Sequence, residues 1–151
     1  MEQGRGTRVE FKLLGPLEVE QDGRTLAIGG RRQRALLAIL LLHSNEVVLR
    51  ERLIDALWGD HFPEKAANSL QVAVHALRKL LGADRIATRG AGYLLRVEER
   101  ELDLLRFEEL TDQARAEVPP AAAETLRKAL ALWRGAPLSD LGETAFADAE
   151  R

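Results

Sequence analysis

Side chains that can hydrogen-bond to nucleic acid recur at helical spacing within residues 68–79. One face of a helix there would carry Asn68, Gln71, Val72, His75, Arg78 and Lys79. Gln71 can donate and accept at a base edge, and Val72 can touch a thymine methyl group. Arg78 and Lys79 can donate to phosphate oxygens. This set of residue types favours recognition of a DNA duplex.

The opposite side of the same segment is apolar. Leucine and valine recur there at intervals of four, three and four residues, at Leu70, Val74, Leu77 and Leu81. This stripe predicts a helix that packs on a domain core, and we expect it to run from Pro63 to Leu81, before Gly82. A helix anchored in this way presents its polar side outwards.

The basic residues of this face also have a simpler interpretation. Lysine and arginine near the end of a helix complement the helix dipole, so Arg78 and Lys79 alone carry little information. His75 can be an exposed residue without a task. Its place between Gln71 and Arg78 on one face favours DNA.

Three arginines open another predicted helix: Arg31, Arg32 and Arg34. The helix dipole disfavours cations at an N-terminus, so these side chains indicate an anionic partner. DNA phosphates or the carboxylates of Glu46 and Glu51 can fill that role, and both alternatives stay open here.

Enzymatic chemistry is not indicated. The segment Gly90-Ala91-Gly92 lacks the context of a phosphate-binding loop, and no serine stands in a G-x-S-x-G setting. The three histidines have no metal-ligand spacing, and the chain has no cysteine. We therefore expect no catalytic residue, no metal and no cofactor.

Short strands are predicted ahead of the helices. Residues 11–14 and 17–20 flank Gly15-Pro16, and Asp22-Gly23 is a two-residue hairpin signal before residues 25–28. They predict an antiparallel meander. Its dry face would carry Phe11, Leu13, Leu17 and Val19.

The rest of the first half predicts helices and a hairpin. Helices are expected at residues 31–43, 50–58 and 63–81, and the apolar run 35–42 places the first one at the centre of the domain. Residues 86–88 and 93–96 flank a glycine-rich tip and predict a β-hairpin. A meander, three helices and a hairpin form a winged helix-turn-helix, in which one helix enters the major groove and the hairpin, or wing, lies on the neighbouring groove. The predicted fold class is α+β.

The character of the chain changes after Val97. Asp103 can cap a helix that carries Phe107, Leu110 and Ala114, and Pro119-Pro120 interrupts it. A second amphipathic stripe is predicted at Leu126, Leu130 and Trp133. We interpret Trp58 and Trp133 as core anchors. Helical repeats need about three units to bury their faces, so we expect an all-α helical-repeat segment that is incomplete here.

Composition and charge agree with this organisation. The chain has 151 residues, 46% of them hydrophobic and 30% charged, which is typical of a globular protein. Its longest apolar run is far shorter than the ~20 residues of a membrane span, and no signal-peptide core opens it. We expect a cytoplasmic, nucleoid-associated protein with no membrane partner.

The net charge of −2 divides into +4 for residues 1–96 and −6 for residues 97–151, which favours a polyanionic partner for the first part.

Two segments carry a family resemblance. Residues 68–81, with Leu77-Arg78-Lys79 near the helix end, and the wing sequence Thr88-Arg89-Gly90-Ala91-Gly92-Tyr93 resemble the OmpR/PhoB-type winged-helix domain. Residues 31–37 and 57–59 are similar to the Streptomyces antibiotic regulatory protein family (AfsR/DnrI type). In that family a bacterial transcriptional activation domain of helical repeats follows, and residues 102–107 and 129–135 resemble its opening. The resemblance implies a DNA-binding domain at 8–97 and the N-terminal part of an activation domain at 98–151.

The resemblance also implies roles for individual residues. Base contacts would come from Gln71, Val72, His75 and Ala76, and backbone contacts from Asn68, Ser69, Ala73 and Arg78. Arg89 would enter or skirt the minor groove. The expected DNA-binding residues are thus Asn68, Ser69, Gln71, Val72, His75, Arg78, Lys79, Thr88, Arg89 and Tyr93, with phosphate contacts possible at Arg31, Arg32 and Arg34. Alanine at positions 73 and 76 implies few direct base contacts.

The function implied is that of a sequence-specific transcriptional activator of a biosynthetic gene cluster. It would bind promoter direct repeats of double-stranded DNA, form a homodimer there, and meet RNA polymerase holoenzyme through residues 59–65. Because the chain begins with the strands, we expect no phospho-acceptor receiver domain in it. Two alternatives remain: a protein–protein interaction module whose winged helix does not bind DNA, and the N-terminal fragment of a larger regulatory ATPase.

Overall fold

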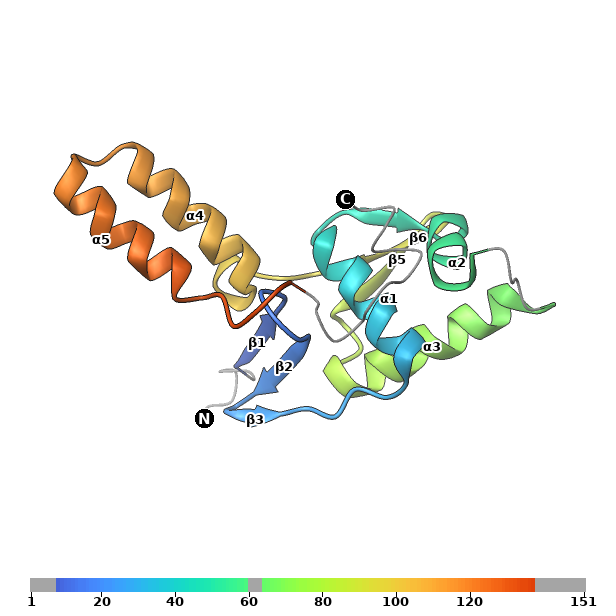
Figure 1. Cartoon of the computed structure of the whole chain (residues 1–151). Helices are drawn as coiled ribbons and strands as arrows, with labels where there is room; N and C mark the ends of the chain where they lie inside the picture. Colours follow the sequence, from blue (N-terminus) through green and yellow to red (C-terminus); the bar gives the residue numbers. More distant parts are fainter. Residues whose placement is uncertain (1–7, 60–63, 138–151) are drawn as a thin grey trace. The chain divides into compact units, whose positions relative to one another are not determined.

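The computed structural model of the chain describes residues 8–59 and 64–137 (Figure 1). Its element order is three strands, helices with a further strand between them, a β-hairpin, and then two helices, which confirms the predicted α+β winged-helix plan. The described residues form two compact units, one made by 8–26 together with 98–137 and the other by 27–97. The strands thus group with the helices after residue 97.

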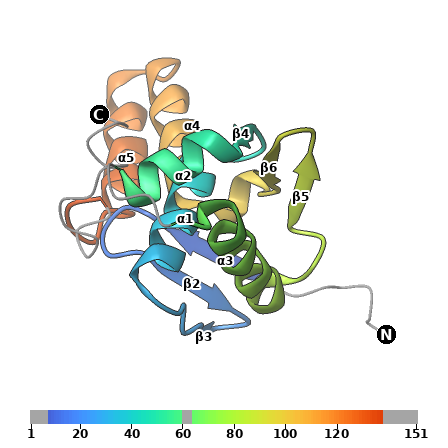
Figure 2. The same cartoon turned by 90° about the vertical axis from the view of Figure 1, so that its right-hand side faces the viewer.

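Three helices build the second unit: α1 (Arg31–Leu42), α2 (Arg50–Trp58) and α3 (Ala66–Leu81), which all contact one another (Figure 2). In α1 every residue from Ala35 to Leu41 is buried, which confirms its central position. Helix α2 has the predicted bounds and ends at Gly59. Trp58 is only 9% exposed and anchors this helix as expected.

Helix α3 buries the predicted stripe of Leu70, Val74, Leu77 and Leu81. The predicted start at Pro63 lies outside the described residues, and Glu64 and Lys65 form a turn instead of helix. Lys65 has non-helical backbone angles (φ −116°, ψ 54°), so the regular helix begins only at Ala66.

A three-stranded antiparallel sheet completes the unit of residues 27–97. Its order is β4 (Val47–Leu49), β6 (Gly92–Leu95) and β5 (Ile86–Arg89), so β5 is an edge strand. The hairpin of β5 and β6 confirms the predicted wing. Gly92 lies opposite Leu49, and a Cβ at Gly92 would collide with the carbonyl oxygen of Val48.

The amide of Asn45 closes the end of this sheet. Asn45 has a left-handed backbone (φ 64°), and its Nδ2 donates to the carbonyl of Val97 at 2.8 Å. The N–H of Val97 donates back to Oδ1 of Asn45 at 3.0 Å. This pair of bonds imitates a strand pairing and holds the last residue of the unit.

The other unit contains the predicted meander: β1 (Val9–Lys12), β2 (Glu18–Gln21) and the short β3 (Arg24–Thr25). Asp22 (φ 53°) and Gly23 (φ 83°) form the turn between β2 and β3, and both have the positive φ that a type I′ hairpin requires. The predicted dry face is buried at all four positions: Phe11, Leu13, Leu17 and Val19.

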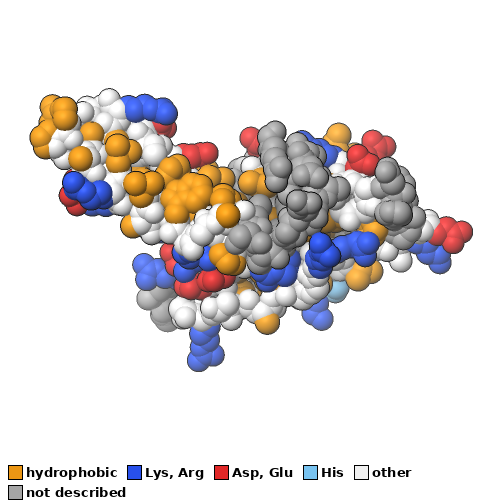
Figure 3. All heavy atoms as spheres, in the orientation of Figure 1, with side chains coloured by type: hydrophobic (Ala, Val, Ile, Leu, Met, Phe, Trp, Pro, Cys, Tyr) orange, Lys and Arg blue, Asp and Glu red, His pale blue; other side chains and the backbone are white. Residues whose placement is uncertain are grey.

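An αα-hairpin follows, as predicted, formed by α4 (Asp103–Arg115) after one 3₁₀ turn, η2 (Glu99–Glu101), and by α5 (Pro119–Leu130). The two prolines begin α5, since an N-terminal helical position needs no donor N–H. The predicted role of Trp133 as a core anchor is wrong, because this side chain is 36% exposed, and Leu126 and Leu130 of the same stripe are 42% and 64% exposed. Small residues are buried in these helices instead: Ala114, Thr125 and Ala129. Figure 3 shows hydrophobic side chains gathered over this hairpin.

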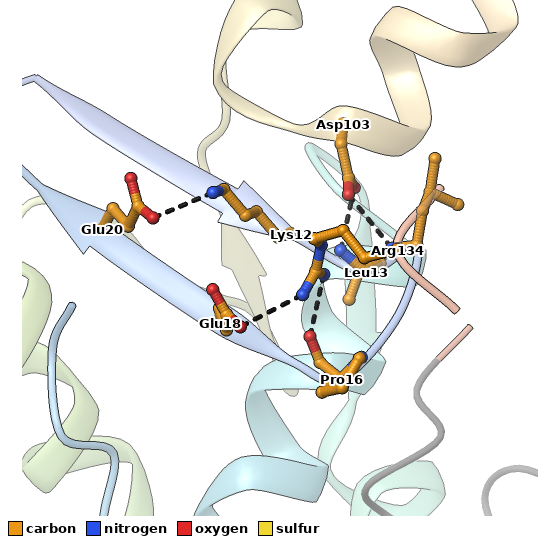
Figure 4. Close-up of polar contacts among 8 residues, drawn as sticks. Lys12, Leu13, Pro16, Glu18, Glu20, Asp103 and Arg134 are labelled. Atoms are coloured by element: carbon orange, nitrogen blue, oxygen red, sulfur yellow. Dashed lines mark hydrogen bonds and ion pairs between the residues drawn. The ribbon is translucent and has the colours of Figure 1, made fainter. Parts of the chain in front are cut away.

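Asp103 does not cap α4, which corrects the sequence prediction. It is the first helical residue, and its carboxylate accepts the backbone N–H groups of Leu13 at 2.8 Å and Leu14 at 3.0 Å (Figure 4). Arg134 holds the same turn, because its N–H donates to the carbonyl of Leu14 at 2.7 Å and its Nη2 to that of Pro16 at 2.8 Å. These contacts explain why the strands group with the later helices.

Within the described residues, no helix has the length and apolar character needed to cross a membrane.

Candidate nucleic-acid interface

The side of α3 that faces away from the core carries residues for which the sequence analysis predicted base and phosphate contacts. We call this set the recognition face, and all its members are exposed: Asn68, Gln71, Val72, His75 and Lys79. Val72 is 63% exposed. Ser69, Ala73 and Ala76 are half-buried beside this face. The helix is therefore anchored on one side and open on the other, as the periodicity predicted.

Arg78 occupies a different environment from the recognition face. It is half-buried, and its Nε donates to the carbonyl of Ile86 at 2.9 Å. Its Nη2 donates to Oγ1 of Thr88 at 2.8 Å. The guanidinium also lies 5.8 Å from the ring centroid of Tyr93, within the range of a cation–π contact. Sequence reasoning missed this bridge between α3 and the wing.

The wing separates its buried residues from its exposed ones. Tyr93 is 4% exposed, so its ring is part of the domain interior. Thr88 and Arg89 are exposed, and Arg89 ends β5 just before the tip residue Gly90, which has a positive φ of 55°. The structure thus brings Arg78, Thr88 and Tyr93 together, whereas Arg89 is exposed at the end of β5.

The arginines at the start of α1 lie in two kinds of surroundings. Arg31 and Arg32 are exposed and Arg34 is half-buried. The guanidinium of Arg32 lies 5.1 Å from the ring centroid of Trp58, so this side chain also packs on α2. The first turn of α1 contains no acidic residue, and its N-cap Gly30 has no capping side chain.

Oε1 of Glu46, one of the two carboxylates weighed as partners for these arginines, lies 3.8 Å from Nδ1 of His43. Among residues 8–59 and 64–137, no three potential ligand side chains gather in a way that could hold a metal ion.

Two family models match the sequence. Residues 23–95 match the family described as "Transcriptional regulatory protein, C terminal", and residues 102–151 match "Bacterial transcriptional activator domain".

Similar proteins include AfsR of Streptomyces coelicolor, which is 36% identical over 143 residues, covering 91% of this chain and 14% of AfsR. EmbR of Mycobacterium tuberculosis is 37% identical over 154 residues, covering 93% of this chain and 39% of EmbR. RedD of Streptomyces coelicolor is 32% identical over 149 residues, covering 91% of this chain and 43% of RedD. The chain spans less than half the length of each of these relatives.

The fold also matches a solved structure. Mycobacterium tuberculosis EmbR in complex with a low-affinity phosphopeptide superposes with a TM-score of 0.88 at 35% identity, covering 95% of this chain and 41% of that one. The helical segment after the winged helix is present in both. With an OmpR/PhoB-type domain followed by a bacterial transcriptional activator domain, and with AfsR and RedD among its relatives, the chain belongs to the Streptomyces antibiotic regulatory protein family of transcriptional regulators.

Proposed function

We propose that the chain binds promoter DNA in a sequence-specific manner, with α3 in the major groove and the wing on the adjacent minor groove. One observation carries this proposal: the recognition face is exposed along α3, directly opposite the buried leucine-valine stripe. A helix presented in this way can lie across base edges while its other side stays in the core.

The expected contacts fall into three groups, according to whether a side chain would reach base edges, phosphates or the minor groove. Gln71 and His75 would donate to or accept from base edges, and Val72 would meet a thymine methyl group. Lys79, Asn68 and Ser69 would contact phosphates beside the helix. Arg89 would reach the minor groove, and Arg31 with Arg32 and Arg34 would provide further phosphate contacts. Thr88 and Tyr93 belong to the wing that carries Arg89.

One winged helix buries only about 600–1,000 Å² on DNA, which is little for specific binding. We therefore propose that two copies bind direct repeats as a homodimer on the promoter, as activators of a biosynthetic gene cluster. The segment 59–65 would contact RNA polymerase holoenzyme, with residues 60–63 of it outside the described structure. We also propose that the DNA-binding domain ends at residue 97 and that the activation domain begins at residue 98. The protein would be located on the nucleoid.

Footprinting on genomic fragments, followed by fluorescence-anisotropy titration of the protected duplex, tests this function. Arg89→Ala and Lys79→Ala should each weaken binding and reduce the slope of log K against log salt by about one. Gln71→Ala should lose discrimination at one base pair, about 1–3 kcal/mol.

The matched control is Arg127→Ala, which removes an exposed arginine from α5 that pairs with Glu124. It should bind like the wild type with an unchanged salt slope. If Arg89→Ala and Lys79→Ala bind as tightly as Arg127→Ala, the assigned contacts are wrong.

A second function, a protein–protein interaction module, is favoured by the exposed apolar side chains of the α4–α5 hairpin: Val118, Leu126, Leu130 and Trp133. It would be preferred if no duplex binds at low salt while a protein partner co-purifies. The intact mass of the native protein decides whether the chain acts within a larger regulatory ATPase.

A further inference from the structure

We propose that Arg78 and Thr88 form a latch that fixes the wing against α3, so that Arg78 acts on DNA binding by placing Arg89. In this role Arg78 is a positioning residue and not the phosphate contact that the family resemblance implies. Its effect on DNA rests on the proposed function, whereas the latch is a property of the free protein.

The latch holds strand β5 at two points. Nε of Arg78 donates to the carbonyl of Ile86, and Nη2 donates to the hydroxyl of Thr88 two residues further along the strand. The guanidinium is planar, so two donors bound at two positions define the orientation of the strand as well as its distance from α3.

The neighbouring strand provides a third point. Tyr93 is the register partner of Thr88 in β6, and its buried ring lies under the guanidinium of Arg78. One side chain from the last turn of α3 therefore contacts both strands of the wing.

The position of strand β5 in the sheet indicates that these contacts matter for its stability. The sheet order β4-β6-β5 makes β5 an edge strand with a sheet partner on one side only. Ile86 at its start is buried, but Thr88 and Arg89 at its end are exposed. The exposed end of an edge strand, which has a sheet neighbour on one side only, opens more easily than the middle of a sheet. Arg89 follows Thr88 directly, so any twist of the strand end moves the side chain that would enter the groove.

The two roles of Arg78 predict different outcomes for a lysine substitution. Lysine keeps the positive charge, so Arg78→Lys would preserve much of a phosphate contact. Lysine has no planar fork and cannot donate to Ile86 and Thr88 in the same geometry. Under the latch, Arg78→Lys should therefore behave like Thr88→Val, which removes only the acceptor hydroxyl.

The test compares Arg78→Lys, Thr88→Val and Thr88→Ser in the full chain. Amide hydrogen exchange of β5 and β6, measured without DNA, should accelerate about two- to tenfold in Thr88→Val, the range of one lost hydrogen bond, and at least as much in Arg78→Lys. In Thr88→Ser it should stay close to wild type. Affinity for the footprinted duplex should fall by a similar factor in the first two variants. In an Arg89→Ala background neither substitution should weaken binding further, because the residue that it places is gone.

Unchanged wing exchange in both Arg78→Lys and Thr88→Val would overturn the latch. Equal losses of affinity in the wild-type and Arg89→Ala backgrounds would also overturn it, and would assign the two residues to direct DNA contact. If no duplex binds but wing exchange responds as expected, the proposed function fails while the latch stands.

Discussion

The carboxylate of Asp103 accepts the backbone N–H of Leu13 at 2.8 Å, across 90 residues of sequence. Its other oxygen accepts the N–H of Leu14, and Asp103 is only 7% exposed. Water cannot readily replace a carboxylate in such a place. The turn after β1 and the start of α4 are therefore one structural element.

Asp103→Ala should lower the free energy of unfolding by about 2–4 kcal/mol, because two charge-assisted hydrogen bonds are lost and two buried N–H groups remain unpaired. Asp103→Asn keeps one acceptor oxygen and should lose less. Urea denaturation followed by circular dichroism measures both. Asp112→Ala serves as the control, since Asp112 forms an exposed pair with Arg115 and should change stability by no more than about 0.5 kcal/mol. Equal effects at positions 103 and 112 would contradict the structural role of Asp103.

Gly92→Ala should disrupt the sheet of the winged-helix unit. A methyl group at Gly92 would meet the carbonyl of Val48 and the side chain of Val47, so β4 and β6 could not keep their spacing. We expect a loss of about 1–3 kcal/mol, seen as a lower melting temperature and as lost amide protection in β4.

Gly90→Ala is the matched control for Gly92→Ala. The added Cβ would enter open space, so the substitution is disfavoured only by the left-handed backbone at this position (φ 55°). We expect it to lower the free energy of unfolding by about 1 kcal/mol. If Gly90→Ala were the more harmful of the two, steric contact at Gly92 would not be the reason for that glycine.

Glu117 links the two helices of the αα-hairpin and should titrate abnormally. The hydroxyl of Thr125 donates to it at 2.6 Å and Nε2 of Gln113 at 3.0 Å, and these bonds lower the pKa of Glu117 below its usual 4.5. Because the folded-state pKa is the lower one, this stabilisation is present above pH 4.5 and is lost as the pH falls through the folded-state pKa.

Thr125→Val should therefore raise the pKa of Glu117 towards 4.5, as followed by carbon NMR of the carboxyl group. Gln113→Ala removes the smaller contribution and should raise that pKa less. A larger shift in Gln113→Ala than in Thr125→Val would reverse the assigned order of the two donors.

Lys12 should titrate in the opposite sense. Its Nζ donates to Glu20 at 2.8 Å, which raises the pKa of Lys12 above 10.5 despite partial burial, and the charges of Glu20, Glu10 and Glu18 add to the effect. The resulting stabilisation is complete below pH 10.5 and is lost as the pH rises through the folded-state pKa. Glu20→Gln should lower this pKa more than Glu18→Gln, as measured by NMR of the lysine side chain. The reverse order would remove Glu20 as the principal partner.

Local periodicity predicted much of the winged-helix unit. The bounds of α2 and the buried stripe of α3 follow from residues three and four positions apart, which a helix brings together whatever surrounds it. The same spacing placed the recognition face on the outside. The start of α3 was predicted too early, because Pro63 is a good helix opener but Glu64 and Lys65 turn instead.

Long-range contacts were beyond this kind of prediction. Asp103 has the residue type of a cap, and only the fold shows that its acceptors serve a turn 90 residues away. Leu126 and Leu130 have the spacing of a buried stripe, but α5 buries Thr125 and Ala129 instead. Arg78 matched a phosphate-binding pattern, and its bonds to Ile86 and Thr88 depend on where the hairpin folds back. In each case the deciding partner comes from another element.

The separation between Leu13 and Asp103 has a consequence for biosynthesis. Strands β1 and β2 leave the ribosome before Asp103 and Arg134, the two residues that secure the turn between these strands. Residues 27–97 contain all three helices and the whole sheet β4-β6-β5 of the winged-helix unit that the structure describes. A nascent chain paused near residue 97 would therefore already contain these helices and strands, whereas the turn after β1 would still lack the carboxylate that accepts its N–H groups.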